Sequence, residues 1–478
     1  MANIKFFNTE SFPLEMHKVC TVQQLTIPSV ERRVEALYET GFNSYRLTTD
    51  DLYLDMLTDS GVNAMSNEQL ASMLRADEAY AGSATYKRLS AKIKEIFNKD
   101  YFLPVHQGRA CENMLARGLV KEGDIIPMNF FFGSTVNQIK QCGGTFRIML
   151  CDEGLKLQSD VPFKGNFDLE KLESFLKAER GRVPFMRIEA GTNLIGGQPI
   201  ALDNMLAAVR LCKEYGALAV LDASLLQDNL YFIKTREEAY KNASIREITR
   251  KLADAVDIIY FSARKLGFAR GGGICLNDSE IYERLKAFVA RFEGFPTYGG
   301  MSVREMEAIC VGLDDTMNED VISQGPQMIA FLCGELQKHG VPVVTPPGGL
   351  GCHIDAMKFV PHIPYEQYPA GSLACAIYIA SGSRGMERGC IDEPWEDGKP
   401  AYGAMELVRL AVPRRVYTVS QMRYMADRVA WLYEHRDLIG GIKFESEQYK
   451  NFFDRLTAVN DWPYRLAEQF RRDFGDSV

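Results

Sequence analysis

The sequence lacks the signals of three protein classes. Its 11 cysteines are odd in number and form no C-x-x-C pair, which argues against a disulfide framework or a zinc site and favours free thiols in a reducing cytosol. No run approaches the roughly 18 apolar residues of a membrane span. The N-terminus has no long apolar core of the kind found in signal peptides. We therefore expect a cytoplasmic protein.

An excess of positive charge is also missing. The net charge is −8, which argues against nucleic acid as the main partner. We find no internal repeat and no low-complexity segment. The composition is that of a globular protein, with 46% hydrophobic and 25% charged residues, and the length of 478 residues suggests two or three domains.

Strands and helices are expected to alternate through the first part of the chain. Residues 124–132, 184–189, 217–222 and 258–261 are apolar runs that indicate strands. Helical patterns separate them, one of them capped by Asp203. This alternation predicts an α/β fold with a mostly parallel sheet covered on both faces.

The pattern changes after about residue 300. Two helices are expected, over 301–317 and 321–339, and a separate α/β unit begins near Val341. Within this unit, the apolar residues 376–380 indicate a strand and residues 386–389 a charged turn.

Lys265 is the first candidate for chemistry. It follows the apolar run 258–261 by a few residues. A lysine held at the end of a buried strand loses hydration, so its amine can act as a nucleophile toward an aldehyde cofactor, above all pyridoxal phosphate. Ser262 and Arg264 beside it suit an anionic phosphate. A basic loop after a strand remains the alternative interpretation.

Asp222 is the second candidate, because it ends the apolar run 217–222. Pyridoxal chemistry needs an anion at the pyridine nitrogen, which makes the ring an electron sink. In an open α/β sheet, ligands gather at the carboxyl ends of strands, where Asp222 and Lys265 are both expected. An aspartate that caps the next helix is the alternative.

A phosphate cradle is expected where Gln107, Gly108 and Arg109 precede the helical run 110–119. Glycine lets the backbone approach an anion, and a helix N-terminus offers free amides. Phe132, at the end of its strand, could lie flat on a heteroaromatic cofactor, although core packing explains such rings equally well.

Arg409 interrupts an otherwise apolar strand. A buried arginine without a partner is costly, so we expect it to face a carboxylate. That carboxylate belongs either to a substrate or to a structural ion pair.

Longer motifs occur along the chain: Leu57-Thr-Asp-Ser-Gly-Val-Asn-Ala-Met-Ser66, Asp77-Glu-Ala-Tyr-Ala-Gly82, His106-Gln-Gly-Arg109, Asn193-Leu-Ile-Gly-Gly-Gln-Pro199, Tyr231-Phe-Ile-Lys234, Met386-Glu-Arg-Gly389 and Val408-Arg-Leu-Ala-Val-Pro-Arg-Arg-Val-Tyr417. Together they resemble the β-eliminating lyases that use pyridoxal phosphate, the family of tyrosine phenol-lyases and, more distantly, tryptophanases. The resemblance runs from about Val19 to Phe453.

The resemblance implies the type I, aspartate aminotransferase-like fold of pyridoxal enzymes. Residues 58–317 would form the large cofactor-binding domain and 318–478 a smaller C-terminal α/β domain. Residues 1–57 would form an N-terminal arm and part of the small domain. A homotetramer with active sites shared between subunits is also implied.

The resemblance further implies residue roles. Lys265 would hold the cofactor and abstract the α-proton, and Tyr80 would act as a general acid on the leaving group. The other cofactor residues would be Gln107, Gly108, Arg109 and Ser262 at the phosphate, Phe132 stacked on the ring, Asp222 at the ring nitrogen, and Asn193. The substrate residues would be Arg409, Asn193 and Ser60 at the α-carboxylate, Arg388 at a phenolic oxygen, and Tyr45, Thr58, Gly133 and Phe452 in the side-chain pocket. Glu78 and Gly61 match part of the family's potassium site.

The chain departs from the family at several positions. Gly133 stands where the phenol-lyases have a threonine, and Leu225 where they have an arginine. Arg270 replaces an asparagine of the cation site, and its guanidinium could replace the ion. Residues 454–478 have no clear counterpart. The cofactor site is therefore kept, while the leaving-group pocket is modified.

The implied activity is β-elimination from an aromatic L-amino acid, tyrosine or a substituted tyrosine first, giving a phenol, pyruvate and ammonia. Arg388 favours this over a tryptophanase-like activity. Elimination or replacement at the sulfur of cysteine or an S-substituted cysteine is an alternative, and an aminotransferase is a more distant one. A cofactor-binding protein without turnover is disfavoured, because Lys265, Tyr80 and Arg409 are all present.

Overall fold

The computed structural model describes residue 6 and residues 11–391, 395–396, 399–400, 405–446 and 453–475. The chain divides into two compact units. Unit 1 consists of residues 1–3 and 60–326, and unit 2 of residues 4–59 and 327–478. No helix in the described part of the chain has the length and apolar character needed to cross a membrane.

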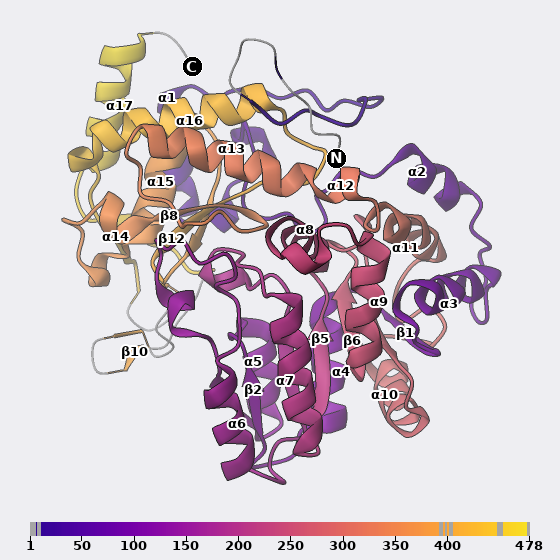
Figure 1. Cartoon of the computed structure of the whole chain (residues 1–478). Coiled ribbons are helices and arrows are strands. Elements are labelled where there is room, and N and C mark those ends of the chain that lie inside the picture. The colour runs from indigo at the N-terminus through magenta and orange to yellow at the C-terminus, as the bar shows by residue number, and fades with distance from the viewer. Residues whose placement is uncertain are drawn as a thin grey trace. The chain divides into compact units, whose positions relative to one another are not determined.

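Unit 1 is built on a seven-stranded sheet with the order β1-β7-β6-β5-β4-β2-β3 (Figure 1). Strands β2 to β6 run parallel, and β7 runs antiparallel to both β1 and β6. The strands are β1 (Tyr101–Val105), β2 (Ile125–Met128), β3 (Thr145–Ile148), β4 (Phe185–Glu189), β5 (Leu218–Asp222), β6 (Ile258–Ser262) and β7 (Gly272–Leu276).

Helices flank this sheet, with α7 on β4 and β5, and α4 on β6 and β7 (Figure 1). Strands β4 and β6 are buried along their whole length, as expected of a parallel sheet covered on both faces. The helices of unit 1 are α2 (Asn67–Leu74), α3 (Ala84–Phe97), α4 (Gly108–Leu119), α5 (Gly133–Gln141), α6 (Leu169–Ala178), α7 (Leu202–Glu214), α8 (Leu226–Arg236), α9 (Ile245–Ala255), α10 (Ser279–Phe292), α11 (Val303–Asp315) and α12 (Glu319–Ile322).

Unit 2 has its own hydrophobic core. It contains a three-stranded antiparallel sheet with the order β8-β12-β9. Its helices are α1 (Val30–Thr40), α14 (Ala356–Phe359), α15 (Pro369–Ser381), α16 (Val419–Glu434) and α17 (Trp462–Phe474), while α13 (Gln324–Lys338) begins three residues before the unit boundary. Its strands are β8 (Gly351–Asp355), β9 (Met386–Arg388), β10 (Trp395–Glu396), β11 (Lys399–Pro400), β12 (Leu407–Ala411), β13 (Ile442–Phe444) and β14 (Leu456–Ala458).

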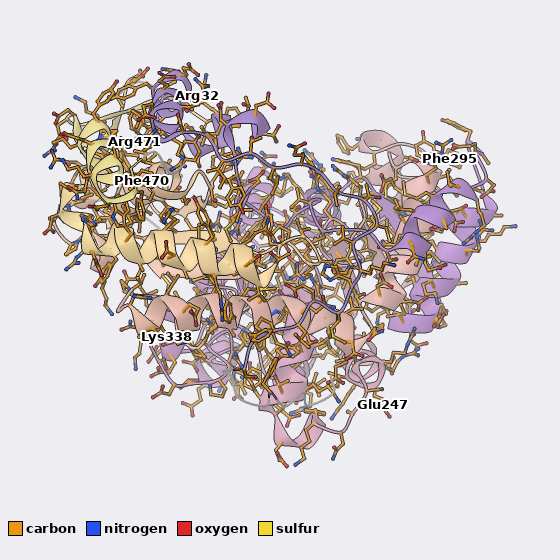
Figure 2. All side chains as sticks on the ribbon, turned by 90° about the horizontal axis from the view of Figure 1, so that it is seen from above. Arg32, Glu247, Phe295, Lys338, Phe470 and Arg471 are labelled. Carbon is orange, nitrogen blue, oxygen red and sulfur yellow. The ribbon has the colours of Figure 1, made fainter. Side chains whose placement is uncertain are left out.

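The C-terminal helix α17 belongs to the core of unit 2. Phe470 is fully buried, with the Arg33 guanidinium 5.3 Å from its ring centroid, and Arg471 forms an ion pair with Glu31 of α1 (Figure 2). Burial of Trp462 on the same helix adds to this packing. Residues 453–475 are therefore a structural part of this unit.

Three local predictions were wrong. Residues 376–380 lie in α15, a helix buried on every side, so its sequence carries no amphipathic period that would separate it from a strand. Residues 386–388 form the strand β9 instead of a turn. Asp203 lies in the first turn of α7, whose N-cap is Ala201.

Candidate functional site

Several strands of unit 1 end at the same edge of the sheet. Val105 at the end of β1 is paired with Gly272, and Gly272 is paired with Ser262 at the end of β6. Asp222 ends β5 and is paired with Tyr260 of β6. The register therefore brings together the positions at which the sequence predicted a ligand.

The start of α4 forms a backbone cradle beside Ser262. Its N-cap, Gln107, supplies no side-chain hydrogen bond to the first helical amides. A Cβ on Gly108 would lie 2.9 Å from the Ser262 Cβ, and one on Gly272 would lie 3.2 Å from the Gly108 nitrogen. Glycine at both positions thus allows this close approach, and the helix N-terminus keeps amides for an anion. Arg109 is exposed at the same helix start.

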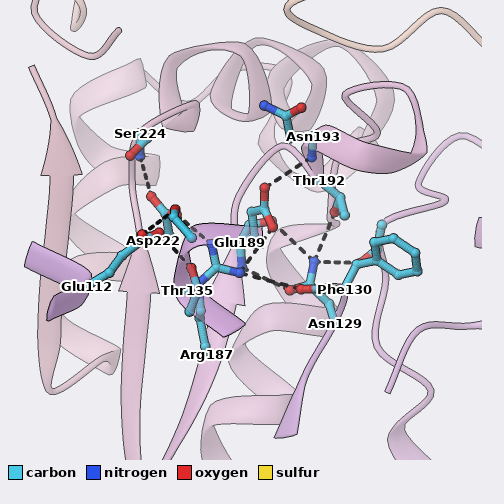
Figure 3. Close-up of polar contacts among 12 residues, drawn as sticks. Glu112, Asn129, Phe130, Thr135, Arg187, Glu189, Thr192, Asn193, Asp222 and Ser224 are labelled. Carbon is cyan, nitrogen blue, oxygen red and sulfur yellow. Dashed lines mark hydrogen bonds and ion pairs between the residues drawn. The ribbon is translucent and has the colours of Figure 1, made fainter. Parts of the chain in front are cut away.

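Asp222 is held by a buried hydrogen-bond network (Figure 3). Its Oδ2 accepts hydrogen bonds from Arg187 Nη2 at 2.7 Å and from Tyr260 Oη at 2.9 Å, and its Oδ1 accepts one from the Ser224 amide at 3.0 Å. A carboxylate offers about four acceptor sites. Asp222 is therefore fixed in orientation while Oδ1 retains capacity for a further donor.

Two more buried carboxyl groups surround this network. Glu189 accepts hydrogen bonds from Arg187 Nη1 at 3.1 Å and from the Asn193 amide at 3.2 Å. Glu112 accepts from Ser134 at 2.5 Å and Thr135 at 2.6 Å. Burial raises the pKa of both glutamates; Arg187 opposes that effect, and the Asp222 charge adds to it. Each glutamate therefore gives up its proton less readily than an exposed glutamate would.

Lys265 and Phe132 lie near one another. The Lys265 Nζ is 5.9 Å from the centroid of the Phe132 ring. Phe132 is the N-cap of α5, and Gly133 is the first residue of that helix. A Cβ at Gly133 would meet no heavy atom within 4 Å, so a larger residue would fit there. Leu225, another position at which the sequence analysis expects a departure from the family, is buried at the N-cap of α8.

The residues of the expected cation site have partners from the chain itself. Glu78 Oε1 accepts a hydrogen bond from Arg304 Nε at 2.7 Å. The Gly61 amide donates to the Arg264 carbonyl at 2.8 Å, and the Arg270 amide donates to Glu305 at 3.1 Å. Among the described residues there is no cluster of three or more His, Cys, Asp or Glu side chains that could hold a metal ion. The Ser60 carbonyl oxygen accepts a long hydrogen bond of 3.5 Å from Arg264 Nη2.

Tyr80 lies in an aromatic group with Phe295 and Tyr298. The ring centroids are 5.9 Å and 5.5 Å from that of Tyr80, and Phe295 is exposed in Figure 2. Tyr80 itself is 74% exposed. Its contact with the Tyr298 hydroxyl raises the pKa of Tyr80, so Tyr80 keeps its proton.

In unit 2, Arg409 and Arg388 share one face of the three-stranded sheet. Arg409 is buried in β12 and donates through Nη2 to the Leu57 carbonyl at 2.8 Å and to the Met386 sulfur at 2.8 Å. Arg388 Nη1 lies 3.8 Å from the same sulfur. Burial lowers the pKa of Arg409 to about 10, and the Arg388 charge adds to this effect, whereas Asp59 opposes it. Two guanidinium groups therefore converge on a neutral side chain, which is an arrangement suited to an anion.

The remaining predicted pocket residues of unit 2 are partly buried. Tyr45 lies in a short helical turn whose N-cap, Asn43, accepts a hydrogen bond from the Tyr45 amide at 3.0 Å. Thr58 precedes Asp59, a fully buried carboxylate that pairs with Arg414 at 2.6 Å. Phe452 falls outside the described residues.

Sequence reasoning missed the supports of Asp222. Arg187 and Glu189 lie in the buried strand β4, and Tyr260 lies in β6. The signal was available, because charged residues inside an apolar strand need partners. The same argument singled out Arg409 and applies equally to Arg187.

The chain is similar to known lyases. Residues 55–428 match the model of a family described as β-eliminating lyases. A tyrosine phenol-lyase of Pasteurella multocida is 37% identical over 436 residues, covering 90% of this chain and 95% of that protein. A tryptophanase of Hyphomonas neptunium is 38% identical over 438 residues, covering 91% and 96%. The resemblance seen in the sequence motifs is confirmed.

Solved structures support the expected fold. Bna3p, a putative kynurenine aminotransferase of Saccharomyces cerevisiae, has a TM-score of 0.61 at 14% identity, covering 86% of this chain and 97% of its own. A serine palmitoyltransferase variant of S. paucimobilis with bound PLP has a TM-score of 0.56 at 11% identity, covering 81% and 89%. At such identities the likeness concerns the fold alone, and it confirms the type I fold expected from the sequence.

Proposed function

The chain belongs to the β-eliminating lyase family, and from this premise we propose that it is a pyridoxal phosphate-dependent carbon–carbon lyase. Its proposed substrate is tyrosine or a ring-substituted tyrosine, which it would convert to a phenol, pyruvate and ammonia. The observation that carries the proposal is Asp222, fixed by Arg187 and Tyr260 at the sheet edge where β6 leads to Lys265.

The residues of unit 1 fit pyridoxal phosphate. The uncapped start of α4 next to Ser262 is a cradle that a Cβ at position 108 would fill, and Asp222 can accept a further hydrogen bond. When bound, the cofactor withdraws electrons from the α-carbon of the substrate. The residues that would hold it are Lys265 at its aldehyde carbon, Asp222 at its nitrogen, Phe132 on its ring, Gln107, Gly108, Arg109 and Ser262 at its phosphate, and Asn193.

Proton transfers would fall to Lys265 and Tyr80. The Lys265 Nζ would accept the α-proton of the substrate, and the Tyr80 hydroxyl, which keeps its proton, would deliver one to the leaving ring carbon. The Arg409 guanidinium would bind the α-carboxylate, assisted by Asn193 and Ser60. Arg388 would donate to the phenolic oxygen, in a side-chain pocket for which Tyr45, Thr58, Gly133 and Phe452 are proposed.

We expect Arg409→Lys to lower kcat/KM for every amino-acid substrate by roughly 10- to 100-fold, because a hydrogen bond between charged groups contributes about 1.5–3 kcal/mol. Lysine keeps the charge but lacks the planar fork that matches a carboxylate. Initial rates of pyruvate release from tyrosine and from S-ethylcysteine measure the loss.

Arg384→Lys is the matched control, since Arg384 is also a buried arginine of unit 2 but pairs with Asp55 at 2.7 Å. Arg384→Lys should lower the melting temperature without a comparable rise in KM. An Arg409→Lys defect confined to tyrosine would move Arg409 from the carboxylate to the side-chain pocket.

Arg388→Ala should lower kcat/KM for tyrosine roughly 10- to 100-fold, because it removes a charged donor from a phenolic oxygen. S-Ethylcysteine has no such oxygen, so its elimination should fall much less, and the ratio of the two rates reports the effect. Arg423→Ala, at an exposed position on α16, is the control. Tyrosine cleavage that survives Arg388→Ala intact would refute the phenol-lyase assignment.

One substrate screen tests the proposal as a whole. Tyrosine, ring-substituted tyrosines, tryptophan and S-alkylcysteines are compared by release of pyruvate and ammonia, and of phenol or indole. Release of phenol and pyruvate from tyrosines in equal amounts is the expected result. Turnover of tryptophan with inert tyrosines would replace the phenol-lyase assignment by a tryptophanase-like one.

The cellular location, the oligomeric state and a bound potassium ion are also part of the proposal. The cytoplasmic location is supported by the 11 free cysteines, none of which is in a disulfide. We also propose a homotetramer with shared active sites, on the basis of the family resemblance. A potassium ion at Glu78 and Gly61 is a further proposal, for which Glu78 would have to exchange the Arg304 guanidinium for the ion.

A further inference from the structure

His353 is a buried side chain beside the two guanidinium groups of unit 2. It lies in β8 directly opposite Arg409 of β12, and Arg409 lies opposite Met386 of β9. Its neighbours Cys352 and Ile354 belong to the hydrophobic core. Because side chains alternate along a strand, His353 points to the other face, on which Arg409 and Arg388 lie.

The hydrogen bonds of His353 define what its ring can accept. Nδ1 lies 2.9 Å from the Gly351 carbonyl oxygen. A carbonyl only accepts, so the proton is assigned to Nδ1 and the lone pair to Nε2. His353 is 3% exposed, and Nε2 has no hydrogen-bond partner among the described residues. A buried polar atom without a partner is costly, which indicates a ligand group at this position.

The ring stays neutral at any ordinary pH. Burial lowers the pKa of His353 to about 3, and the Arg409 and Arg388 charges contribute to the shift. Nε2 is therefore an acceptor throughout the working range, and the ligand group that meets it must be a donor.

Few groups of an amino-acid substrate satisfy this requirement. The ionised α-carboxylate has no proton to donate. An indole N–H could donate to His353 but would leave the donors of Arg388 without an acceptor. A phenolic hydroxyl does both, since its oxygen accepts from Arg388 while its proton is donated to His353.

We propose that His353 is a specificity-determining residue that accepts a hydrogen bond from the phenolic hydroxyl of the substrate, the same hydroxyl whose oxygen Arg388 contacts. This inference rests on the proposed tyrosine lyase activity and deepens it. Under this inference the protein recognises the proton of the phenolic hydroxyl as well as its oxygen. A substrate ring must therefore carry an O–H group, and not only an oxygen atom, to be bound well.

Three substitutions separate this role from packing. His353→Gln places an amide oxygen near the position of Nε2. His353→Asn places an amide NH2 near the position of Nδ1 and no acceptor near Nε2, and His353→Phe keeps the ring volume without an acceptor. We expect the ratio of kcat/KM for tyrosine to that for S-ethylcysteine to fall roughly 5- to 100-fold in the Asn and Phe variants. The Gln variant should keep the ratio within about threefold.

His362→Phe is the control, because this histidine of unit 2 is exposed and uses its Nε2 on the Ile439 carbonyl at 2.8 Å. It should not change the ratio. Competitive inhibition by phenylalanine, compared with binding of tyrosine, adds a readout that does not need cleavage. The variants that lose the Nε2 acceptor should lose the preference for tyrosine over phenylalanine.

The outcomes are distinguishable. Equal losses on both substrates in all three variants, or an unchanged preference for tyrosine in His353→Phe, would overturn the inference and assign His353 to packing. If the wild-type protein releases no phenol, the proposed function fails. The binding preference then decides the inference alone: a hydroxyl preference that disappears in His353→Phe supports it, and the absence of any preference refutes it.

Discussion

Replacing Lys265 by alanine should abolish steady turnover, with a loss of more than about 10⁴-fold. A positioned general base alone contributes roughly 10²–10⁴-fold, and Lys265→Ala also removes the covalent anchor of the cofactor. Cofactor should still bind through the α4 cradle and Ser262. Single-turnover assays of pyruvate release, together with the visible absorption of the protein, separate loss of chemistry from loss of cofactor.

Lys164 is the alternative candidate for the lysine that binds the cofactor. It is fully buried, and burial lowers the pKa of Lys164 to about 8, so it is another amine with nucleophilic character. Borohydride reduction of the loaded wild-type protein should fix the cofactor to a peptide that contains Lys265. Fixation on Lys164, or normal turnover by Lys265→Ala, would show that the assignment is wrong.

Asp222→Ala should lower the rate of α-proton exchange by at least roughly 10³-fold, because it removes the charge that keeps the cofactor an electron sink. It should also weaken cofactor binding. Exchange of the substrate α-proton in heavy water reports the chemistry, and equilibrium dialysis reports the cofactor. An unchanged exchange rate would rule out the electron-sink role.

The network around Asp222 supplies the controls. Asp222→Ala removes one of the two carboxylate partners of the buried Arg187 and leaves only Glu189. Breaking a buried ion pair costs about 3–5 kcal/mol, so instability could lower the rate as well. Asp222→Asn keeps an acceptor for Arg187 and removes only the charge. Its exchange rate should remain low while its melting temperature stays closer to that of the wild type. Tyr260→Phe removes one donor at 2.9 Å and should cost only about three- to tenfold.

Much of the fold could be predicted because its strands are apolar, short and separated by capped helices. The strands that end at Asp222 and Ser262 were found in this way, and the structure places both ends at one edge of the sheet. The helix α15 could not be found in this way, since burial on every side removes the period that separates helix from strand. Its place depends on the packing of the whole unit.

A site residue could be predicted where it is a charged residue within an apolar stretch of the sequence. Lys265 and Arg409 are charged groups in apolar surroundings, and each drew attention by itself. Glu112 lies on α4 and Arg187 on β4, and only the folded sheet brings both into the surroundings of Asp222. His353 gave no signal in the sequence, because its meaning depends on the strand that lies opposite.

The convergence of Arg409 and Arg388 on Met386 has a thermodynamic consequence for the free protein. Two like charges on a neutral sulfur repel each other in surroundings that screen them weakly. This repulsion disfavours the charged form of Arg409, and the Asp59 charge opposes it. An anion bound at Arg409 would add to the effect of Asp59, so the stability of the protein is linked by mass action to its anionic ligands. Simple carboxylates that are not substrates should therefore raise the melting temperature of the protein.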